Sequence, residues 1–443
     1  MLKTFKKGGV HPPENKISAG AAIEKLPLPK LVSVPLSQHI GAPSKVLVKK
    51  KDEVKAGQLI AETAGFISAN IHSPVAGTVK RITKVMTAGG YKTDAVSIQV
   101  GEEDIWEDGI DTSNTIIRKI KAEPDEILEK IKQAGIVGMG GATFPSHVKL
   151  NPPKGKTAET LIINGVECEP YLTSDHRVML EMAEELIIGT QIMMKALKVE
   201  HAYIGIENNK KDAIEKLEKL CKNVNITVIP LKVKYPQGGE KQLIKAVINR
   251  EVPSGALPIE VGAVVHNVGT AVATYHAVQK NKPLVERVIT VTGKEVKKPS
   301  NFLVRIGTPT EQLIEAAGGM PENTGKIISG GSMMGKAIIS TDVPVTKGTS
   351  GIVLIPEKES YRREIKACIR CSKCISVCPM GLEPYLLMAL TQNDLYEREE
   401  KEGAMDCIEC GSCSYICPSD RPLLDYIRLG KKRVGAMIRE RNS

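Results

Sequence analysis

The sequence predicts a multidomain α/β protein, with a β domain near its start and a helical, cysteine-rich domain near its end. Three observations support this prediction. β-Branched residues alternate with Gly and Pro over residues 31–104, strand-like and helix-like segments alternate over 112–287, and eight of the ten cysteines lie after residue 367. At 443 residues the chain is longer than one ordinary hydrophobic core supports, so three or four domains are expected.

The first domain, over residues 1–106, is predicted to be a barrel sandwich of short strands and turns. Its two halves, 52–59 and 73–79, resemble the paired hairpins of biotinyl and lipoyl carrier domains. In those carriers a lysine at the hairpin tip takes the prosthetic group. Residues 66–70 between the halves contain no lysine, so we expect a structural module rather than a swinging arm.

An acidic linker, 107–111, separates this domain from a predicted α/β domain over 112–287. Strands alternate with helix-period segments there, which is the order of a layered α/β fold. Residues 288 to about 340 return to short strands around one helix, with Thr308 as its N-cap candidate before Pro309. The segments that carry the α/β prediction are the strands 161–163 and 202–206 and the helices 180–197 and 211–221.

Two cysteine runs of identical spacing predict two [4Fe–4S] clusters. Both runs read C-x2-C-x2-C-x3-C-P, a spacing in which three thiolates come from one tight loop and the fourth ligates the other cluster. We therefore expect cluster 1 to be held by Cys368, Cys371, Cys374 and Cys417. The expected ligands of cluster 2 are Cys407, Cys410, Cys413 and Cys378.

Other uses of these cysteines explain less of the pattern. Zinc needs only C-x2-C pairs, which leaves a third cysteine and a following proline in each run unexplained. Disulfides are disfavoured because nothing else marks the chain as secreted. The long spacer 380–406 is rich in helix formers, so we expect a helical dicluster ferredoxin domain over 360–435 rather than a minimal ferredoxin.

Composition limits the partners and the compartment. No run of 18 apolar residues is present, and the start of the chain is rich in lysine, so we expect a cytoplasmic, peripheral protein. The lone cysteines Cys168 and Cys221 suit a reducing compartment. A net charge of +10 does not indicate nucleic acid, because the basic residues are scattered and aromatic residues make up only 3%. A surface that meets acidic proteins or anionic cofactors is the better interpretation.

Clusters pass single electrons, so a metabolic enzyme needs a two-electron converter beside them, and a flavin is the usual one. The most glycine-dense loop, 138–145, lacks the third glycine of a dinucleotide fingerprint and is weak evidence alone. The loop 164–170 leaves a predicted strand with an amide and two carboxylates, at the edge where open α/β sheets bind ligands. Two further glycine-bearing turns follow at 235–241 and 266–270.

These four segments, in this order, resemble the flavin- and NADH-binding core of the 51-kilodalton subunit of respiratory complex I. Over nearly the whole chain the sequence more closely resembles the RnfC family of the Rnf electron-transport complex, through residues 5–16, 235–241, 266–270 and both cysteine runs. The resemblance implies a Rossmann-like domain with non-covalent FMN and NAD(H). It also implies a ubiquitin-like, soluble-ligand-binding β-grasp domain over 288–345.

The resemblance further implies a set of cofactor-binding residues. It implies a flavin lined by Gly138, Gly140, Gly141 and Ala142, with Phe144 stacked on the dinucleotide base and Lys149 near the FMN phosphate. Hydrogen bonds to the flavin are implied for Asn164, Tyr235, Gly238, Asn267 and Thr270, and carboxylates near the nicotinamide nucleotide for Glu167, Glu169 and Glu240.

Departures from the complex I pattern, at Met139, Val166, Gly239 and Gly269, predict weaker flavin retention because polar contacts are lost. No catalytic acid or nucleophile is expected, since hydride transfer needs stacking. Cys168 lies between Glu167 and Glu169, whose negative charges should disfavour its thiolate form. The motif G-x4-G-K at 330–336 is followed by Ala337 instead of a Mg²⁺-binding hydroxyl, so nucleotide hydrolysis is rejected.

The expected function is that of an electron-transfer subunit in a membrane-bound ferredoxin:NAD⁺ oxidoreductase, peripheral at the cytoplasmic face of the cell membrane. It would exchange hydride between NAD(H) and FMN and single electrons with the clusters. The resemblance implies integral-membrane partner subunits that translocate ions, iron–sulfur subunits as further partners, and ferredoxin as an indirect partner. Two alternatives remain: a corrin reductase of propanediol-degrading compartments, and a non-catalytic relay in which only the clusters are active.

Overall fold

Two small antiparallel sheets form the N-terminal barrel sandwich. The structure, a computed structural model, describes residues 2–442. One sheet has the order β2-β8-β7-β4 and the other β3-β5-β6, and their inner faces share one apolar core that includes Val32, Ile60 and Ile98. The strands are β2 (Leu31–Pro35), β3 (Lys45–Val46), β4 (Glu53–Val54), β5 (Leu59–Glu62), β6 (Ile71–His72), β7 (Gly77–Met86) and β8 (Lys92–Val100).

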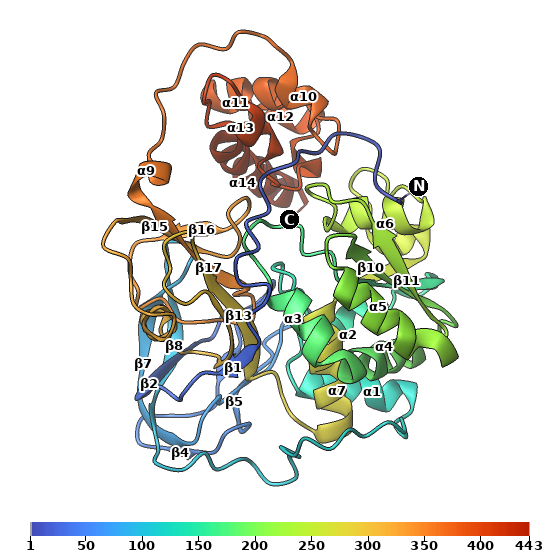
Figure 1. Ribbon diagram of the computed structural model, residues 1–443, viewed down its shortest axis with the longest axis vertical. Coiled ribbons are helices and arrows are strands. Elements are labelled where there is room, and N and C mark those ends of the chain that lie inside the picture. The colour runs from blue at the N-terminus through green and yellow to red at the C-terminus, as the bar shows by residue number, and fades with distance from the viewer. Residues whose placement is uncertain (1, 443) are drawn as a thin grey trace.

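The α/β domain is a parallel four-stranded sheet of order β11-β10-β9-β12, covered by helices on both faces (Figure 1). Leu161 and Ile163 pack with α1, α4, α5 and α7, whereas Ile162 packs with α6. The strands are β9 (Thr160–Asn164), β10 (Ala202–Glu207), β11 (Ile226–Leu231) and β12 (Ala263–Asn267). The helices are α1 (Pro124–Gln133), α2 (Ser146–Lys149), α3 (Ser174–Glu181), α4 (Ala183–Leu197), α5 (Lys211–Leu220), α6 (Glu240–Ile248) and α7 (Val268–Lys280), with 3-10 turns η1 (Cys221–Asn223) and η2 (Pro258–Val261).

A six-stranded mixed sheet of order β1-β14-β13-β17-β15-β16 forms the third unit. The helix α8 (Thr310–Ala316) packs Leu313 and Ile314 against Ile289 and Phe302 of this sheet. The strand β17 lies beyond residue 345, the end expected for this domain. The strands are β1 (Ile23–Lys25), β13 (Glu286–Thr292), β14 (Ser300–Arg305), β15 (Thr324–Ser329), β16 (Lys336–Ile338) and β17 (Gly351–Pro356).

The cysteine-rich part folds into short helices around a small core, as expected. Leu387, Met388, Leu423 and Ile427 pack there against Cys413. An extended segment after the short helix α9 (Glu357–Ser360) leads into this domain, which stands at the top of Figure 1. Its elements are α10 (Lys373–Ser376), α11 (Pro384–Gln392), α12 (Tyr396–Lys401), η3 (Ala404–Asp406), α13 (Ser412–Ile416) and α14 (Leu423–Asn442).

The N-terminal segment crosses the other domains before it reaches the barrel (Figure 1). The Gly9 amide donates to the Val377 carbonyl at 2.8 Å, and Val10 forms a bridge with Tyr235. The strand β1 then pairs in parallel with β14. The first residues of the predicted barrel domain therefore tie together the α/β, β-grasp and cysteine-rich domains.

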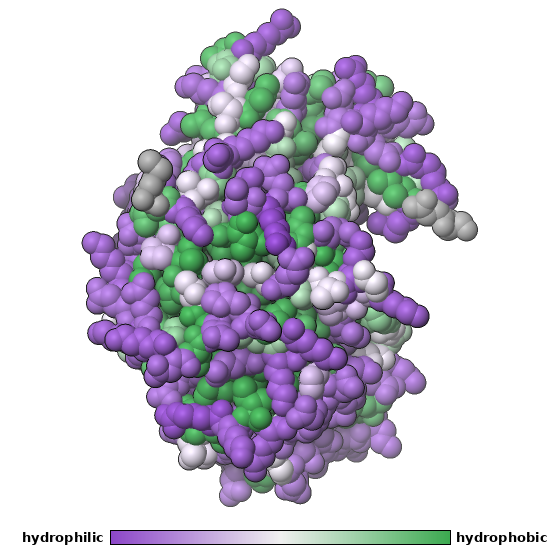
Figure 2. Space-filling view, turned by 90° about the vertical axis from the view of Figure 1, so that its right-hand side faces the viewer, coloured by the Kyte–Doolittle hydropathy of each residue, from purple (hydrophilic) through white to green (hydrophobic). Residues whose placement is uncertain are grey.

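The surface is mixed in character. Figure 2 shows one side of the molecule as mainly hydrophilic, with apolar patches between the polar residues. Among residues 2–442, no helix is both long and apolar enough to cross a membrane.

Candidate functional site

The candidate site lies where the strand order of the parallel sheet reverses. The chain runs outward from β9 through β10 to β11 and then returns to place β12 on the other side of β9. Asn164 and Asn267, the last residues of β9 and β12, are paired in register at this point. Ligands of open α/β sheets bind in the crevice at such a switch point. Asn164 and Asn267, which the sequence analysis placed in two separate loops as flavin-binding residues, therefore lie side by side at the switch point.

The glycine loop is held over the start of α7. The Gly138 amide donates to the Phe144 carbonyl at 2.9 Å, and the Met139 amide donates to Thr270 Oγ1 at 2.9 Å. A Cβ on Gly140 would lie 3.4 Å from the Cβ of Asn267, and Gly141 has a φ of +112°. The loop therefore needs glycine for its backbone conformation at Gly141, while at Gly140 it packs closely against Asn267. Ala142 is exposed and Phe144 half-buried on the open side.

A buried polar network stands behind this loop. Asn267 Nδ2 donates to Asp175 Oδ2 at 2.6 Å, while Asn267 Oδ1 accepts from the Gly269 amide at 2.8 Å and so caps α7. Burial, with Glu167 adding to it, raises the pKa of Asp175 to about 7. Glu167 itself accepts the Asp175 and His176 amides at 2.7 and 3.2 Å. Its carboxylate therefore binds the first turn of α3.

Sequence reasoning missed Asp175 and the buried Arg287, whose guanidinium donates to the Met139 carbonyl at 3.3 Å. Burial lowers the pKa of Arg287 to about 10, while the nearby Asp175 acts to raise it. The helix-start pattern Thr173-Ser174-Asp175 could have drawn attention to the carboxylate. No local signal marks Arg287, because it comes from β13 of another domain.

Asn164 and Gly238 join two of the predicted loops. Asn164 Nδ2 donates to the Gly238 carbonyl at 2.9 Å, and the Gly238 amide donates to Cys168 Sγ at 3.3 Å. Burial, with Glu207 and then Glu169 adding to it, raises the pKa of the Cys168 thiol. The expectation that Cys168 is not a thiolate nucleophile is therefore supported.

Lys149 and Glu240 face each other across the site. Their Nζ and Oε1 atoms are 2.5 Å apart, and the two side chains are 28% and 39% exposed. The sequence assigned Lys149 to a phosphate and Glu240 to a nicotinamide nucleotide. The structure instead pairs them, so an anion that binds Lys149 has to compete with Glu240.

Glu169 binds a loop of another domain, a contact that the sequence did not predict. Its carboxylate accepts the Met333 and Met334 amides at 2.9 and 2.8 Å, in the loop between β15 and β16. Burial raises the pKa of this carboxyl. The loop is the G-x4-G-K segment, and an internal carboxylate occupies the amides that would cradle a phosphate. Glu169 therefore joins the α/β domain to the β-grasp domain.

Tyr235 also has a different partner from the one expected. Its hydroxyl donates to the Cys410 carbonyl at 2.8 Å and lies 3.5 Å from Glu169 Oε1. The ring is only 2% exposed. The loop 235–241 thus reaches from the switch point into the cysteine-rich domain, where its side chain touches the backbone of a predicted cluster ligand.

Four cysteines from the two runs surround one small apolar cavity: Cys378, Cys407, Cys410 and Cys413, with Leu424 and Ile427 beside them. Burial is the main cause that raises the pKa of Cys407 to about 11 and of Cys413 to about 12. Neutral thiols in such a place suit a metal centre, since iron would displace their protons and supply the positive charge. Within the described part of the chain no three His, Cys, Asp or Glu side chains are grouped tightly enough for a single ion.

The other four cysteines lie nearer the surface. Cys374 and Cys417 are half-buried and close enough to interact electrostatically. Cys368 and Cys371 are exposed. The structure therefore brings together the predicted ligands of cluster 2 more fully than those of cluster 1.

The residues around the switch point also fit a polar cofactor. Among the residues that the structure describes, nine buried side-chain nitrogen or oxygen atoms lack a hydrogen-bond partner. Four of them belong to α2, β12, α6 and the segment before α6 in the α/β domain, and unsatisfied buried groups of this kind are rare in a finished site. They are Ser146 Oγ, Gln237 Nε2, Gln242 Oε1 and His266 Nε2.

Comparison with known families agrees with this arrangement. Residues 3–103 match the RnfC barrel sandwich hybrid domain, 131–276 the Nuo51 FMN-binding domain, 288–337 the SLBB domain and 360–418 the 4Fe-4S dicluster domain. These matches confirm the predicted fold class, which combines a barrel-sandwich, a flavin-binding α/β, a β-grasp and a dicluster domain.

Three relatives match this chain over nearly its whole length. The chain is 48% identical over 430 residues to the C subunit of the proton-translocating ferredoxin:NAD(+) oxidoreductase complex of Clostridium ljungdahlii, and the alignment covers 97% of this chain and 93% of the relative. It is 43% identical over 446 residues to the C subunit of the Na(+)-translocating counterpart of Acetobacterium woodii, with 98% of each covered. Identity to the C subunit of the ion-translocating oxidoreductase complex of Rhodobacter capsulatus is 41% over 441 residues, with 98% and 84% covered.

Proposed function

This chain belongs to the RnfC family, the C subunits of ion-translocating ferredoxin:NAD(+) oxidoreductase complexes, and on that premise we propose how its parts divide the work of electron transfer. NAD(H) exchanges hydride with FMN at the switch point, cluster 2 connects the FMN to cluster 1, and cluster 1 exchanges electrons with partner subunits. Ion translocation belongs to those membrane-integral partners. The chain sits peripherally at the membrane, and we assign it to the cytoplasmic face.

The observation that carries this order is the contact between Tyr235 and Cys410. The loop 235–241 contacts Asn164 at the switch point through Gly238, and one hydrogen bond of 2.8 Å joins its Tyr235 to the backbone of a proposed ligand of cluster 2. Val10 and Met333 pack with these two residues, so apolar groups surround the junction. A short, dry connection of this kind suits electron transfer between a flavin and a cluster.

FMN, when bound, supplies the exchange of a hydride with NAD(H) for single electrons. The backbone of the glycine loop is suited to hold it, because its positions without side chains allow close approach. Lys149 would neutralise its phosphate and half-buried Phe144 would offer an aromatic face to the dinucleotide. The residues proposed for its cradle are Gly138, Gly140, Gly141, Ala142, Asn164, Gly238, Asn267 and Thr270.

We propose the crossed ligand sets for the two clusters. Cys378 lines the cavity with Cys407, Cys410 and Cys413, which supports its assignment to cluster 2. Cys374 lies near Cys417, which supports the assignment of Cys417 to cluster 1 with Cys368 and Cys371.

The test is cofactor analysis of anaerobically purified protein, followed by titration with NADH. We expect flavin, iron and sulfide, with bleaching of the flavin and then of the clusters. Gly140→Val should remove flavin and leave iron and sulfide unchanged, because the added side chain meets Asn267. Gly20→Val is the matched control, since a Cβ on Gly20 meets nothing within 4 Å. Clusters without flavin in the wild type, and no uptake of added FMN, would support the non-catalytic relay instead.

A further inference from the structure

We propose that the surface around cluster 1, together with a basic pocket beside it, docks an acidic iron–sulfur protein that exchanges electrons with this cluster. The inference rests on the proposed function, because it needs cluster 1 to be the outer end of the electron route. We define the basic docking surface as the exposed segment 361–373 and the pocket that Arg362 shares with Lys326, Lys336 and Arg428.

The two clusters differ in how closely another protein can approach them. Cys378, Cys410 and Cys413 are buried, whereas Cys368 and Cys371 are exposed. Electron transfer slows steeply with distance, so a partner in solution or in a complex reaches cluster 1 far more readily. Tyr235 already connects the opposite end, cluster 2, to the flavin side.

The segment around cluster 1 carries strong positive charge. Residues 362–373 contain five Arg or Lys residues and one acidic residue, Glu364, and all of these are exposed. Ile365 and Ile369 are also exposed, at 58% and 67%. Exposed apolar side chains within a charged rim are typical of an interaction site. The sign of the charge selects an acidic partner.

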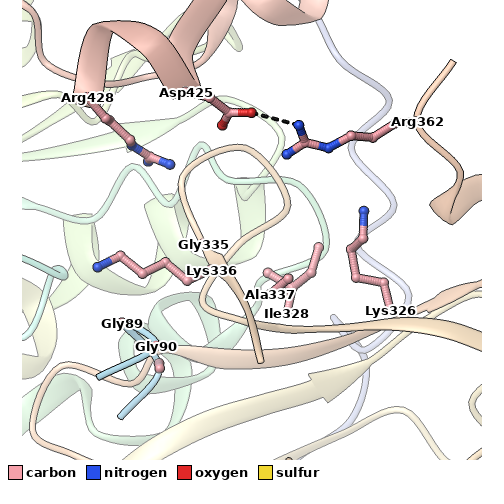
Figure 3. A pocket seen from close by; sticks show the side chains of 11 residues that line it. Gly89, Gly90, Lys326, Ile328, Gly335, Lys336, Ala337, Arg362, Asp425 and Arg428 are labelled. Carbon is pink, nitrogen blue, oxygen red and sulfur yellow. Dashed lines mark ion pairs between the residues drawn. The ribbon is translucent and has the colours of Figure 1, made fainter. Parts of the chain in front are cut away.

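The adjoining pocket lies where three domains meet. The β7–β8 turn at Gly89 and Gly90, the strands β15 and β16, and the helix α14 line a cavity of about 410 Å³. Figure 3 shows its four basic side chains, Lys326, Lys336, Arg362 and Arg428, around the Gly335 loop, with Asp425 as the single carboxylate. Positive charge therefore extends from the cluster 1 segment into a recess that an acidic side chain could enter.

Three of the four pocket cations bond to groups within the chain. Arg362 pairs with Asp425 at 2.9 Å, and Arg428 turns to Glu409 at 3.0 Å. Lys326 donates to the Ser360 carbonyl at 3.1 Å. Within residues 2–442 the Lys336 ammonium has no ion pair or hydrogen bond. It is thus available to a carboxylate from outside.

A nucleotide is a poorer occupant of this pocket. The amides of Met333 and Met334, which would have to cradle its phosphate, already bind Glu169. A protein carboxylate needs no such cradle and pairs with side-chain cations directly.

The test compares two charge-reversed variants with the same net charge. Lys336→Glu with Arg363→Glu changes the basic docking surface, and Lys50→Glu with Lys222→Glu changes two exposed lysines of other domains. Iron-loaded, flavin-loaded protein is added back to membranes that contain the rest of the complex but lack this chain. Bound protein is measured as salt rises, and bleaching by NADH is measured in parallel.

We expect the docking-surface variant to bind roughly tenfold more weakly at low salt and to lose most of its salt dependence, because attraction becomes repulsion. The control should bind like the wild type, and NADH should bleach flavin and clusters equally in all three proteins. The double variant Lys336→Gln with Arg363→Gln should bind with an affinity between those of the wild type and the charge-reversed variant. A graded loss of this kind is expected from charge and not from misfolding.

Equal binding of the two charge-reversed variants would overturn the proposal. A parallel loss of binding to protein-free vesicles of anionic phospholipid would also overturn it, since lipid headgroups would then be the occupant. Failure of NADH to bleach even the wild type would instead remove the proposed function, while the binding comparison would still stand.

Discussion

The buried position of Asp175 in the fold raises the pKa of its carboxyl group. Its ordinary pKa of 3.8 rises to about 7, first because of burial and then because of Glu167. Between these values the folded protein keeps a proton that the unfolded chain has released. Stability therefore falls as the pH rises through this window, and the loss is complete above the folded pKa.

Asp175→Asn should flatten that dependence. An amide cannot titrate, while its oxygen can still accept from Asn267, so the slope of unfolding free energy against pH should decrease between pH about 4 and 7. Denaturant unfolding across this range measures the slope. Above pH about 7 the variant also lacks the negative charge that ionised Asp175 places near Arg287. An unchanged slope would mean that Asp175 is ionised throughout.

At the residue scale, the sequence could predict which groups reach the switch point but not which way they turn. Asn164 and Asn267 end predicted strands, and the geometry of a parallel sheet then brings them together. Glu169 has the same sequence signal as a ligand-facing carboxylate. Its direction is set by two amides from residues more than 160 positions away, which no local pattern reveals.

At the scale of elements, the ion pair between α2 and α6 controls access to the proposed phosphate position. Lys149→Met should weaken FMN binding, because it removes the cation. Glu240→Gln should strengthen it, because Lys149 is released from its competitor. Each change should be several-fold, in keeping with a half-exposed pair. Fluorescence titration of flavin-free protein measures both.

A second pair in the same domain serves as the control for this prediction. Lys156 and Glu260 are also 2.5 Å apart and are 44% and 38% exposed. Lys156→Met and Glu260→Gln should leave FMN affinity unchanged. If Lys149→Met and Glu240→Gln shift the affinity in the same direction, Lys149 does not hold the phosphate.

Elements with a strong periodic pattern were predictable, and short ones were not. The helix expected at 211–221 is α5, Lys211–Leu220, and the strand expected at 202–206 is β10. The helix expected at 180–197 is divided at Met182 into α3 and α4. The N-cap of α8 is Pro309, not Thr308, whose hydroxyl donates to the Arg305 carbonyl. That local hydrogen bond competes with capping.

At the scale of the whole molecule, connections between domains determine how the site meets the clusters. Lys16 donates to the carbonyls of Glu167, Glu169 and Leu172, and so fastens the N-terminal segment to the loop after β9. The three residues of β1 join a sheet formed nearly 280 positions later. A strand this short has no period of its own, so the sequence could not place it.

Glu169 is the contact through which this arrangement can be tested. It holds the loop of the β-grasp domain and approaches Tyr235, which contacts Cys410. Glu169→Gln replaces one accepting oxygen with a donor that faces an amide, so it should loosen the junction with the dicluster domain. We expect reduction of the flavin by NADH at the wild-type rate, and subsequent reduction of the clusters about tenfold slower, since a small misplacement is costly to transfer.

Stopped-flow spectra separate the two steps, with flavin bleaching first and cluster bleaching second. Glu181→Gln is the matched control, because Glu181 also accepts a backbone amide from a distant strand, that of Ile23. Tyr235→Phe should reproduce the slow second step with flavin reduction intact, because only the hydroxyl is removed. Slow flavin reduction in Glu169→Gln, with normal cluster reduction afterwards, would contradict this prediction. It would indicate that Glu169 acts on the nicotinamide nucleotide and that its contact with the loop does not affect electron transfer to the clusters.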